Sequence, residues 1–441
     1  MPNTYLVSLG CDKNRVDGEV MIGSLRLSGY IVVQEPENAQ VIIVNTCGFI
    51  RDAVQESIDL ILELAQYKAG GSCRALVVVG CMAARYRDEI SESIPEVDVI
   101  VGVGEYDGIA GIVEKLVGPG NAAARTDATF ARIAARKDDI APHIAYIKIA
   151  EGCNSNCTYC TIPAIRGAYV SRPMQEISKE AKELVAAGAK ELVLVAQDTT
   201  LYGVDIYNEK MLPCLLEELA SNSGAQWIRL MYAYPEHITQ ELIDTMAKLP
   251  QVCKYIDMPI QHSEDTVLAR MGRAGNCAAL LARIASLRNA MPDIAIRTTL
   301  ITGFPGETVE DFKNMYRFVR DIKFDRLGVF PYSREAGTPA ATMPQQVRKH
   351  IKHARMQRLM ALQQGVHFAA QEAKVGTIAS VIVDELNQDG TYTGRTQHDA
   401  YDVDAVVIFK SDIKLAQGDI CAVRITAADG YDLRGQYEPT K

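Results

Sequence analysis

The sequence is poor in the features of membrane proteins and of proteins that coat nucleic acids. Its 441 residues include one tryptophan and nine phenylalanines, and no apolar run approaches the roughly 18 residues of a membrane span. The formal net charge is −9, which excludes a general positive field for nucleic acid. The N-terminal stretch lacks the basic and apolar segments of a secretion signal. These absences predict a cytoplasmic protein with no membrane partner.

Length and composition predict a folded protein of several domains. Hydrophobic residues make up 48% and charged residues 23% of the chain, which is ordinary for globular proteins and argues against disorder. At roughly 100 to 200 residues per domain, a chain of this length predicts two to four domains.

Residues 1–117 have the pattern of one α/β domain. Four short apolar runs rich in β-branched residues are each followed by a helical pattern, the last at 106–117. Strand-helix alternation of this kind predicts a doubly wound parallel sheet. Residues 118–142, rich in glycine, alanine and charge, are predicted to be a linker. The four apolar runs are 4–10, 40–47, 75–81 and 97–102.

Residues 143–374 contain a second series of strands. Six apolar runs alternate with helical patterns, which predicts a partial (βα)6 barrel with its chemistry at the C-terminal ends of the strands. A long trailing helix is expected at 344–374. Residues 375–441 carry five short strands separated by turn residues, which predicts a small antiparallel β-barrel. The six barrel runs are 144–152, 191–198, 227–233, 255–262, 295–305 and 325–333.

Eleven cysteines, an odd number in a chain without a secretion signal, disfavour a disulfide framework. Cys153, Cys157 and Cys160 form a C-x3-C-x2-C loop directly after a predicted strand. A zinc site would need a fourth Cys or His, and none follows within forty residues. Three thiolates on a four-iron cluster would leave one iron open for catalysis. Three merely structural cysteines are the plainer alternative.

Cys11, Cys47 and Cys81 are distant in sequence but equivalent in position. Each follows an apolar strand of the first domain, and the ends of parallel strands converge on one crevice. Three thiols there predict a second cluster, although for any one of them a buried, inert thiol is the alternative. The remaining five are expected to be ordinary thiols: Cys73, Cys214, Cys253, Cys277 and Cys421.

The C-x3-C-x2-C loop, with Tyr159 before its last cysteine, resembles that of the radical S-adenosylmethionine (SAM) enzymes. In that family the open iron binds SAM, and an electron from the cluster cleaves SAM to a 5'-deoxyadenosyl radical. The GFPGET segment at 303–308 is similar to the family's glycine-rich segment near the SAM adenine, and relatives bind the SAM amino group at the end of the second strand. The implied SAM contacts are Tyr159, Gln197, Asp198, Gly303, Pro305, Gly306 and Glu307.

Two of these segments have a purely structural alternative. GFPGET ends a predicted strand and opens a helix, so Thr308 could be an N-cap with Asp311 in the first turn. Asp257, Gln261 and His262 are either polar caps of the barrel rim or direct contacts to SAM or substrate.

The order of parts resembles the radical SAM methylthiotransferases over essentially the whole chain. These have a three-cysteine α/β domain, a radical SAM partial barrel and a small β-barrel of TRAM type. The family replaces C–H with C–S–CH3 and uses two 4Fe–4S clusters, with SAM as both radical source and methyl donor. The resemblance implies a reducing electron donor and a sulfur source as partners, neither identified by the sequence. Removing hydrogen from an unactivated carbon requires a radical, so the chemistry is consistent.

Two branches of that family fit the chain. One modifies an adenosine of transfer RNA, and the other modifies the β-carbon of an aspartate in ribosomal protein S twelve, free or in the small subunit. AQDTTLYG at 196–203 and DMPIQH at 257–262 resemble the second branch, where the first would have GQN-like and QSG-like motifs. Residues 375–441 hold eleven acidic and six basic residues, and an acidic barrel suits a basic protein better than RNA. A solvated acidic surface without a partner is the alternative.

Two other functions are less consistent with the sequence. A non-catalytic iron–sulfur scaffold has no use for GFPGET or for a linked barrel, and an RNA-binding module should interleave basic and aromatic residues. The sequence therefore favours the protein methylthiotransferase, with the transfer RNA enzyme as the main alternative.

Overall fold

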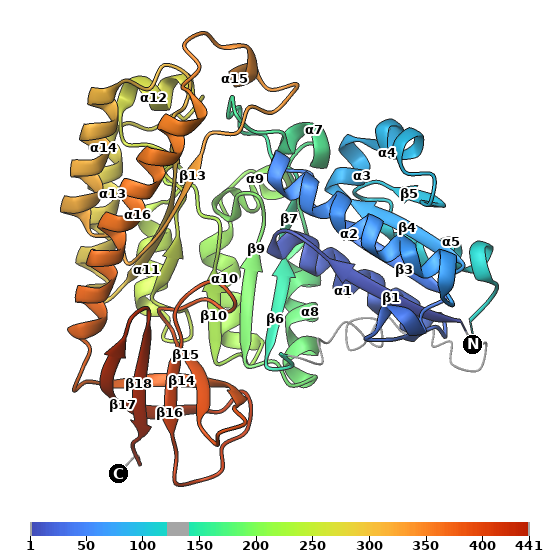
Figure 1. The fold of residues 1–441 in the computed structure, drawn as a ribbon. Helices are drawn as coiled ribbons and strands as arrows, with labels where there is room; N and C mark the ends of the chain where they lie inside the picture. Colours follow the sequence, from blue (N-terminus) through green and yellow to red (C-terminus); the bar gives the residue numbers. More distant parts are fainter. Residues whose placement is uncertain (1, 121–140, 440–441) are drawn as a thin grey trace.

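The computed structural model describes residues 2–120 and 141–439, so the central part of the predicted linker, 121–140, lies outside the described residues. An N-terminal α/β unit, a middle unit of curved sheet and helices, and a C-terminal β-barrel follow one another along the chain (Figure 1). None of the described helices is long and apolar enough to cross a membrane.

The N-terminal unit is a five-stranded parallel sheet in the order β2-β1-β3-β4-β5. Every residue of β3 and β4 is buried, because helices cover both faces of the sheet. The sequence did not predict β2, a two-residue strand at the edge. The elements are β1 Asn3–Ser8, α1 Asp12–Leu27, β2 Ile31–Val32, η1 Pro36–Asn38, β3 Val41–Thr46, α2 Arg51–Gly70, β4 Ala75–Gly80, α3 Cys81–Arg85, α4 Arg87–Ser93, β5 Val99–Val101, η2 Tyr106–Gly108 and α5 Ile109–Val117.

Register brings the C-terminal ends of three of these strands together. Ser8 of β1 pairs with Asn45 of β3, and Thr46 of β3 pairs with Gly80 of β4. The three loops that follow these strands therefore begin at one edge of the sheet.

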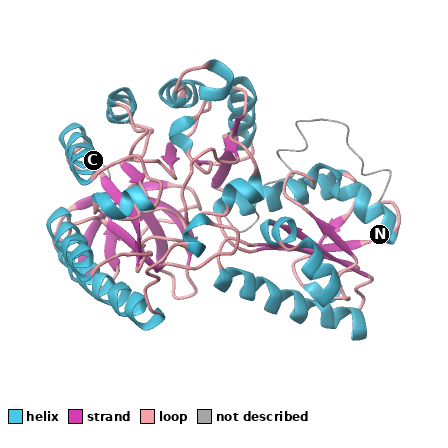
Figure 2. Ribbon diagram, turned by 90° about the horizontal axis from the view of Figure 1, so that it is seen from above, coloured by secondary structure: helices cyan, strands magenta, loops and turns pink. Residues whose placement is uncertain are grey.

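The middle unit has six parallel strands in two halves, β10-β9-β6 and β11-β12-β13. A bridge between Ile228 and Val252 joins the halves, with the N–H of Cys253 donating to the carbonyl of Ile228 at 2.9 Å. Seen from above, helices surround the strands on the outside (Figure 2). The strands are β6 Ile144–Lys148, β9 Glu191–Val195, β10 Trp227–Leu230, β11 Tyr255–Asp257, β12 Ala295–Thr302 and β13 Arg326–Pro331.

The helices of this unit carry the apolar faces that cover the strands, and the long helix expected at 344–374 is α16. A short antiparallel pair, β7 Ala150–Glu151 and β8 Val170–Ser171, frames the cysteine loop. The helices are α7 Ile162–Arg166, α8 Met174–Ala186, η4 Thr199–Leu201, α9 Val204–Tyr207, α10 Leu212–Asn222, α11 Gln240–Lys248, α12 Asp265–Arg270, α13 Cys277–Ala290, α14 Val309–Ile322, α15 Pro339–Thr342 and α16 Lys349–Glu372.

The C-terminal unit is a closed barrel in the order β14-β15-β16-β18-β17. All of its strand pairs are antiparallel except β16 with β18, which is parallel. Buried ions fix the barrel to the middle sheet: Glu191 of β9 accepts from Arg229 at 2.6 Å and from Arg395 of the barrel at 2.8 Å. The strands are β14 Ile378–Leu386, β15 Tyr392–Thr396, β16 Val407–Lys410, β17 Ile420–Asp429 and β18 Asp432–Tyr437.

Candidate active site with two cysteine triads

The first triad gathers at the edge where β1, β3 and β4 end. Cys11 precedes α1, Cys47 follows β3, and Cys81 is the first residue of α3. Gly10 has φ +93°, and a Cβ there would lie 2.9 Å from the Cβ of Cys47, so glycine lets these two loops meet. Burial, with smaller contributions from the nearby thiols of Cys11 and Cys47, raises the pKa of Cys81 to about 11. The charge of Arg166 opposes this shift. The structure thus brings together three cysteines that are far apart in sequence.

The second triad lies in the loop between β7 and α7. Cys153 and Cys157 are buried and Cys160 is half-buried. The backbone N–H groups of Ser155 and Ile162 donate to the sulfurs of Cys153 and Cys160, each at 3.4 Å. Burial raises the pKa of Cys160 to about 12, with a further contribution from the two neighbouring thiols.

Each triad supplies three thiols, the number that would leave one iron of a four-iron cluster open, and the cluster-ligand role of both triads stays a prediction. Among the described residues, no three His, Cys, Asp or Glu side chains converge on one ion. In a four-iron cluster each thiolate binds a different iron, and hydrogen bonds to the sulfurs tune the cluster. The amide donors directed at the sulfurs of the second triad match this requirement.

Gln197 and Asp198, the polar pair that follows β9, have different surroundings. The carboxylate of Asp198 is fully buried and accepts from the backbone N–H of Thr200 at 2.9 Å, and it lies 2.7 Å from Nδ1 of His237. The side-chain nitrogen of Gln197 is buried and has no hydrogen-bond partner among the described residues. The side-chain amide of Gln197 therefore can donate a hydrogen bond to a ligand such as SAM. The carboxylate of Asp198 instead stabilises the loop to which it belongs.

The glycine-rich segment forms a tight turn beside the cysteine loop. Gly303 and Gly306 have φ of +70° and +79°, values that favour glycine, and Pro305 between them is buried. The ring of Tyr159 packs edge-on against Phe304, with centroids 6.5 Å apart. The segment is therefore placed next to the second triad.

Glu307 and Thr308 shape this turn from within. The Glu307 carboxylate accepts from the N–H of Gly303 at 2.6 Å and from Arg355 at 2.5 Å. Thr308 and Asp311 form the reciprocal capping box at the start of α14, with distances of 3.1 and 2.8 Å. The prediction that Thr308 is an N-cap with Asp311 in the first turn is confirmed. The same segment also lies close to the cysteine loop, through the contact of Phe304 with Tyr159.

Polar residues also line the barrel rim beyond β11. Burial raises the pKa of Asp257 to about 6, and its carboxylate accepts from the N–H of Tyr232 at 3.4 Å. Gln261 has φ +68°, outside the usual range for a non-glycine residue. His262 is fully buried, accepts the N–H of Glu264 at its Nδ1, and has no hydrogen-bond partner for Nε2 among the described residues.

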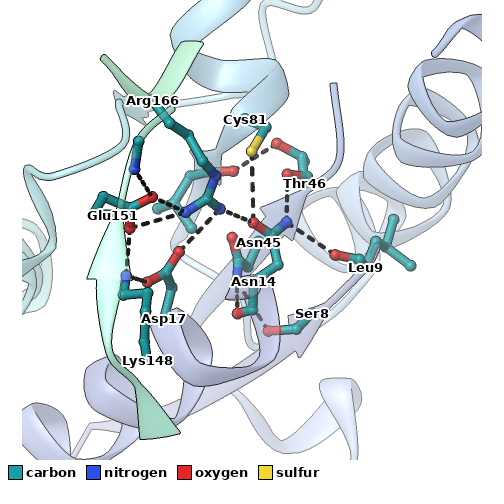
Figure 3. A network of polar contacts seen from close by, with 12 residues as sticks. Ser8, Leu9, Asn14, Asp17, Asn45, Thr46, Cys81, Lys148, Glu151 and Arg166 are labelled. Atoms are coloured by element: carbon teal, nitrogen blue, oxygen red, sulfur yellow. Dashed lines mark hydrogen bonds and ion pairs between the residues drawn. The ribbon is translucent and has the colours of Figure 1, made fainter. Parts of the chain in front are cut away.

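A buried ion network joins the two cysteine-bearing regions (Figure 3). Arg166 ends α7, just after the second triad, and its guanidinium is inaccessible to solvent. It donates to Glu151 at 3.0 Å, and also to Asp17 at 3.1 Å and Asn14 at 2.6 Å, both on α1. Lys148 of β6 completes the network by donating to Asp17 at 2.5 Å and to Glu151 at 2.6 Å. Two cations of the middle unit, both also paired with Glu151 of that unit, thus pair with Asp17 of the first unit across the boundary between them.

Asn14 connects this network to the first triad. Its side-chain nitrogen donates to the carbonyls of Leu9 and Thr46, both at 2.9 Å, and its oxygen lies 3.6 Å from the sulfur of Cys81. Sequence reasoning did not find this network, because its contacts between α1 and the middle unit join residues more than 100 positions apart. The only local signal is that Asn14 and Asp17 are three residues apart and so share a face of α1.

Family models match the three units in the order found in the structure. Residues 3–102 match the uncharacterized protein family UPF0004, residues 147–319 match the radical SAM superfamily, and residues 375–437 match the TRAM domain. Fold and cysteine loop together define a radical SAM enzyme, which uses SAM and 4Fe–4S clusters.

Relatives extend over nearly the whole chain. It is 46% identical to the ribosomal protein uS12 methylthiotransferase RimO of Lachnoclostridium phytofermentans over 98% of the chain and 99% of the relative. It is 45% identical to the enzyme of the same name from Desulforamulus reducens, covering 99% of both. The chain therefore belongs to the family of the ribosomal protein uS12 methylthiotransferases RimO.

Solved structures with the same fold are more distant. The radical SAM methyltransferase TsrM from Kitasatospora setae, with tryptophan and a SAM analogue bound, superposes with a TM-score of 0.56 at 14% identity, over 84% of this chain and 90% of that one. At this level of identity, the similarity supports the fold alone.

Two clusters predict a specific iron content. Anaerobically reconstituted protein should bind about eight irons per chain, and replacing Cys153, Cys157 and Cys160 together by Ala should remove about half of them. Iron and sulfide analysis measures this directly. Wild-type protein that never exceeds four irons under full reconstitution would show that the first triad holds no cluster.

The buried network predicts an unequal response to removing two arginines. Arg166→Ala leaves Asp17 and Glu151 short of a cation, so urea unfolding should show a loss of about 3 kcal/mol or more. The matched control is Arg320→Ala, which removes an exposed pair with Asp321 and should leave the unfolding curve unchanged. Equal effects of the two variants would contradict a joining role for the network.

Proposed function

We propose that this chain transfers a methylthio group to the β-carbon of an aspartate in ribosomal protein uS12, replacing hydrogen, with SAM as both radical source and methyl donor. The relatives named for this reaction support the proposal because they match the chain from end to end. The observation that carries it is the connection of two cysteine triads through one buried network, since radical formation and sulfur transfer must act on the same carbon.

Each triad has its own task in this proposal. Cys153, Cys157 and Cys160 would hold the cluster at which SAM binds, and the unpartnered amide of Gln197 would donate to SAM. Cys11, Cys47 and Cys81 would hold the cluster that carries the sulfur. When bound, these groups supply the radical chemistry and the methylthio unit. A reducing electron donor and a sulfur source complete the reaction, which we place in the cytoplasm.

Docking of the substrate protein involves the C-terminal barrel in this proposal. Part of its acidic character is internal, because Asp384 and Asp399 are buried and paired with Arg395 and Arg326. Other acidic residues remain on the surface and would attract a basic protein: Glu385, Asp389 and Asp412 are exposed. Because exposed charges are screened within ~8 Å at physiological ionic strength, binding of uS12 should weaken as salt is added.

The substrate is tested by mass. Replacing H by SCH3 should add about 46 Da to uS12 in cells that contain this chain, and the shift should disappear when Cys153→Ala is the only copy, because the radical can no longer form. Intact-mass spectrometry of ribosomal proteins measures both. If uS12 keeps its mass while transfer RNA loses a methylthioadenosine in the variant, the substrate is transfer RNA instead.

The division of labour between the triads is tested by separate assays. With Cys11, Cys47 and Cys81 changed to Ala, reduced protein should still cleave SAM to 5'-deoxyadenosine, because the second triad is intact, but should form no methylthio product. Chromatography of the nucleoside and mass spectrometry of uS12 give the two readouts. Loss of SAM cleavage in a folded variant that keeps about four irons would be the contradicting result.

A further inference from the structure

Lys13 is a buried cation without a charged partner. It lies in the first turn of α1, two residues after Cys11, and its side chain is 4% exposed. The ammonium lies over the ring of Tyr232, 3.1 Å from the centroid, and makes no hydrogen bond or ion pair among the described residues. Removing an ammonium from water without an anionic partner is costly, and one aromatic face compensates only in part.

The carboxylates around Lys13 are already engaged elsewhere. Asp12 accepts from the hydroxyl of Tyr232 at 2.8 Å. Asp257 accepts the N–H of Tyr232 and is also stabilised as an anion by the charge of Arg297. Lys13 is near enough to lower the pKa of Asp257, but the two form no ion pair. The ammonium therefore has a place for a further anion.

Lys13 lies close to the place where the reacting part of the substrate would bind. Tyr232 follows β10 at the C-terminal rim of the barrel, where it has φ +58°. Burial raises the pKa of the Tyr232 hydroxyl, and Asp12 and the Cys11 thiol are close enough to add to this shift. Helix α1, which holds Lys13 in its first turn, belongs to the first unit and contacts β6 of the barrel (Figure 1). The ammonium of Lys13 thus lies between the first triad and the barrel rim. A substrate carbon on which both triads act must enter this region.

We propose that the Lys13 ammonium binds the carboxylate of the substrate aspartate and so positions its β-carbon for reaction. This inference rests on the proposed function, in which the modified carbon is bonded directly to that carboxyl group. A charge-assisted hydrogen bond to the carboxylate fixes the β-carbon one bond away. It also makes Lys13 a specificity-determining residue, because an adenosine base offers no carboxylate.

The test compares binding of two uS12 proteins to reconstituted enzyme in the absence of a reductant. Wild-type enzyme should bind uS12 with its native aspartate at least about tenfold more tightly than uS12 with that aspartate changed to Asn, as expected for a hydrogen bond between charged groups. Lys13→Met should bind both proteins with the same weakened affinity, and Lys13→Arg should keep part of the preference. Isothermal titration measures all six affinities.

Controls separate recognition from folding and from the proposed function. Lys68→Met removes an ammonium that pairs with Asp98 at 2.7 Å elsewhere in the first unit, and should keep the full preference. Lys13→Met should retain its iron and its SAM cleavage; if it does not fold, Lys13→Gln replaces it. A preference for aspartate that survives in the folded variant, or is missing from wild type, overturns the role of Lys13. Wild-type enzyme that forms no methylthio group on uS12 overturns the proposed function instead.

Discussion

The fold depends on a guanidinium that is completely removed from water. Arg166 is tolerable in that position only because Asp17 and Glu151 supply negative charge and Asn14 supplies an acceptor (Figure 3). These partners come from both units, so the units must dock for the charges to balance. The same docking places the strand ends of the first unit beside the cysteine loop of the second. Electrostatic pairing therefore fixes how the first cysteine triad lies relative to the second, which the proposed function requires.

Much of the fold was predictable because its signals are local. Each cysteine of the first triad follows a buried apolar strand, and the ends of parallel strands meet, so Cys11, Cys47 and Cys81 could be brought together by pattern alone. The six barrel strands and the C-terminal barrel followed from alternation and turns. What the pattern missed was short or distant in sequence: the two residues of β2, and the parallel pairing of β16 with β18.

The site was harder to predict because neighbouring residues have different surroundings. Gln197 and Asp198 are equivalent in the sequence, yet Asp198 is saturated by its own loop while the amide of Gln197 has no partner among the described residues. Glu307 turns inward to hold the glycine-rich segment. In the acidic C-terminal barrel, Asp384 and Asp399 form internal ion pairs, which a count of charges in the sequence does not reveal. No sequence pattern singled out Lys13, because only its burial beside Tyr232 distinguishes it from the other lysines.

The central claim is that the radical formed at the second triad reaches the substrate carbon that receives sulfur from the first. Isotope transfer tests it most directly. With uS12 deuterated at the β-carbon of the modified aspartate, the 5'-deoxyadenosine released in a single turnover should carry one deuterium, since the hydrogen that sulfur replaces moves to the radical. Methylthio product accompanied by 5'-deoxyadenosine that contains no deuterium would contradict the account.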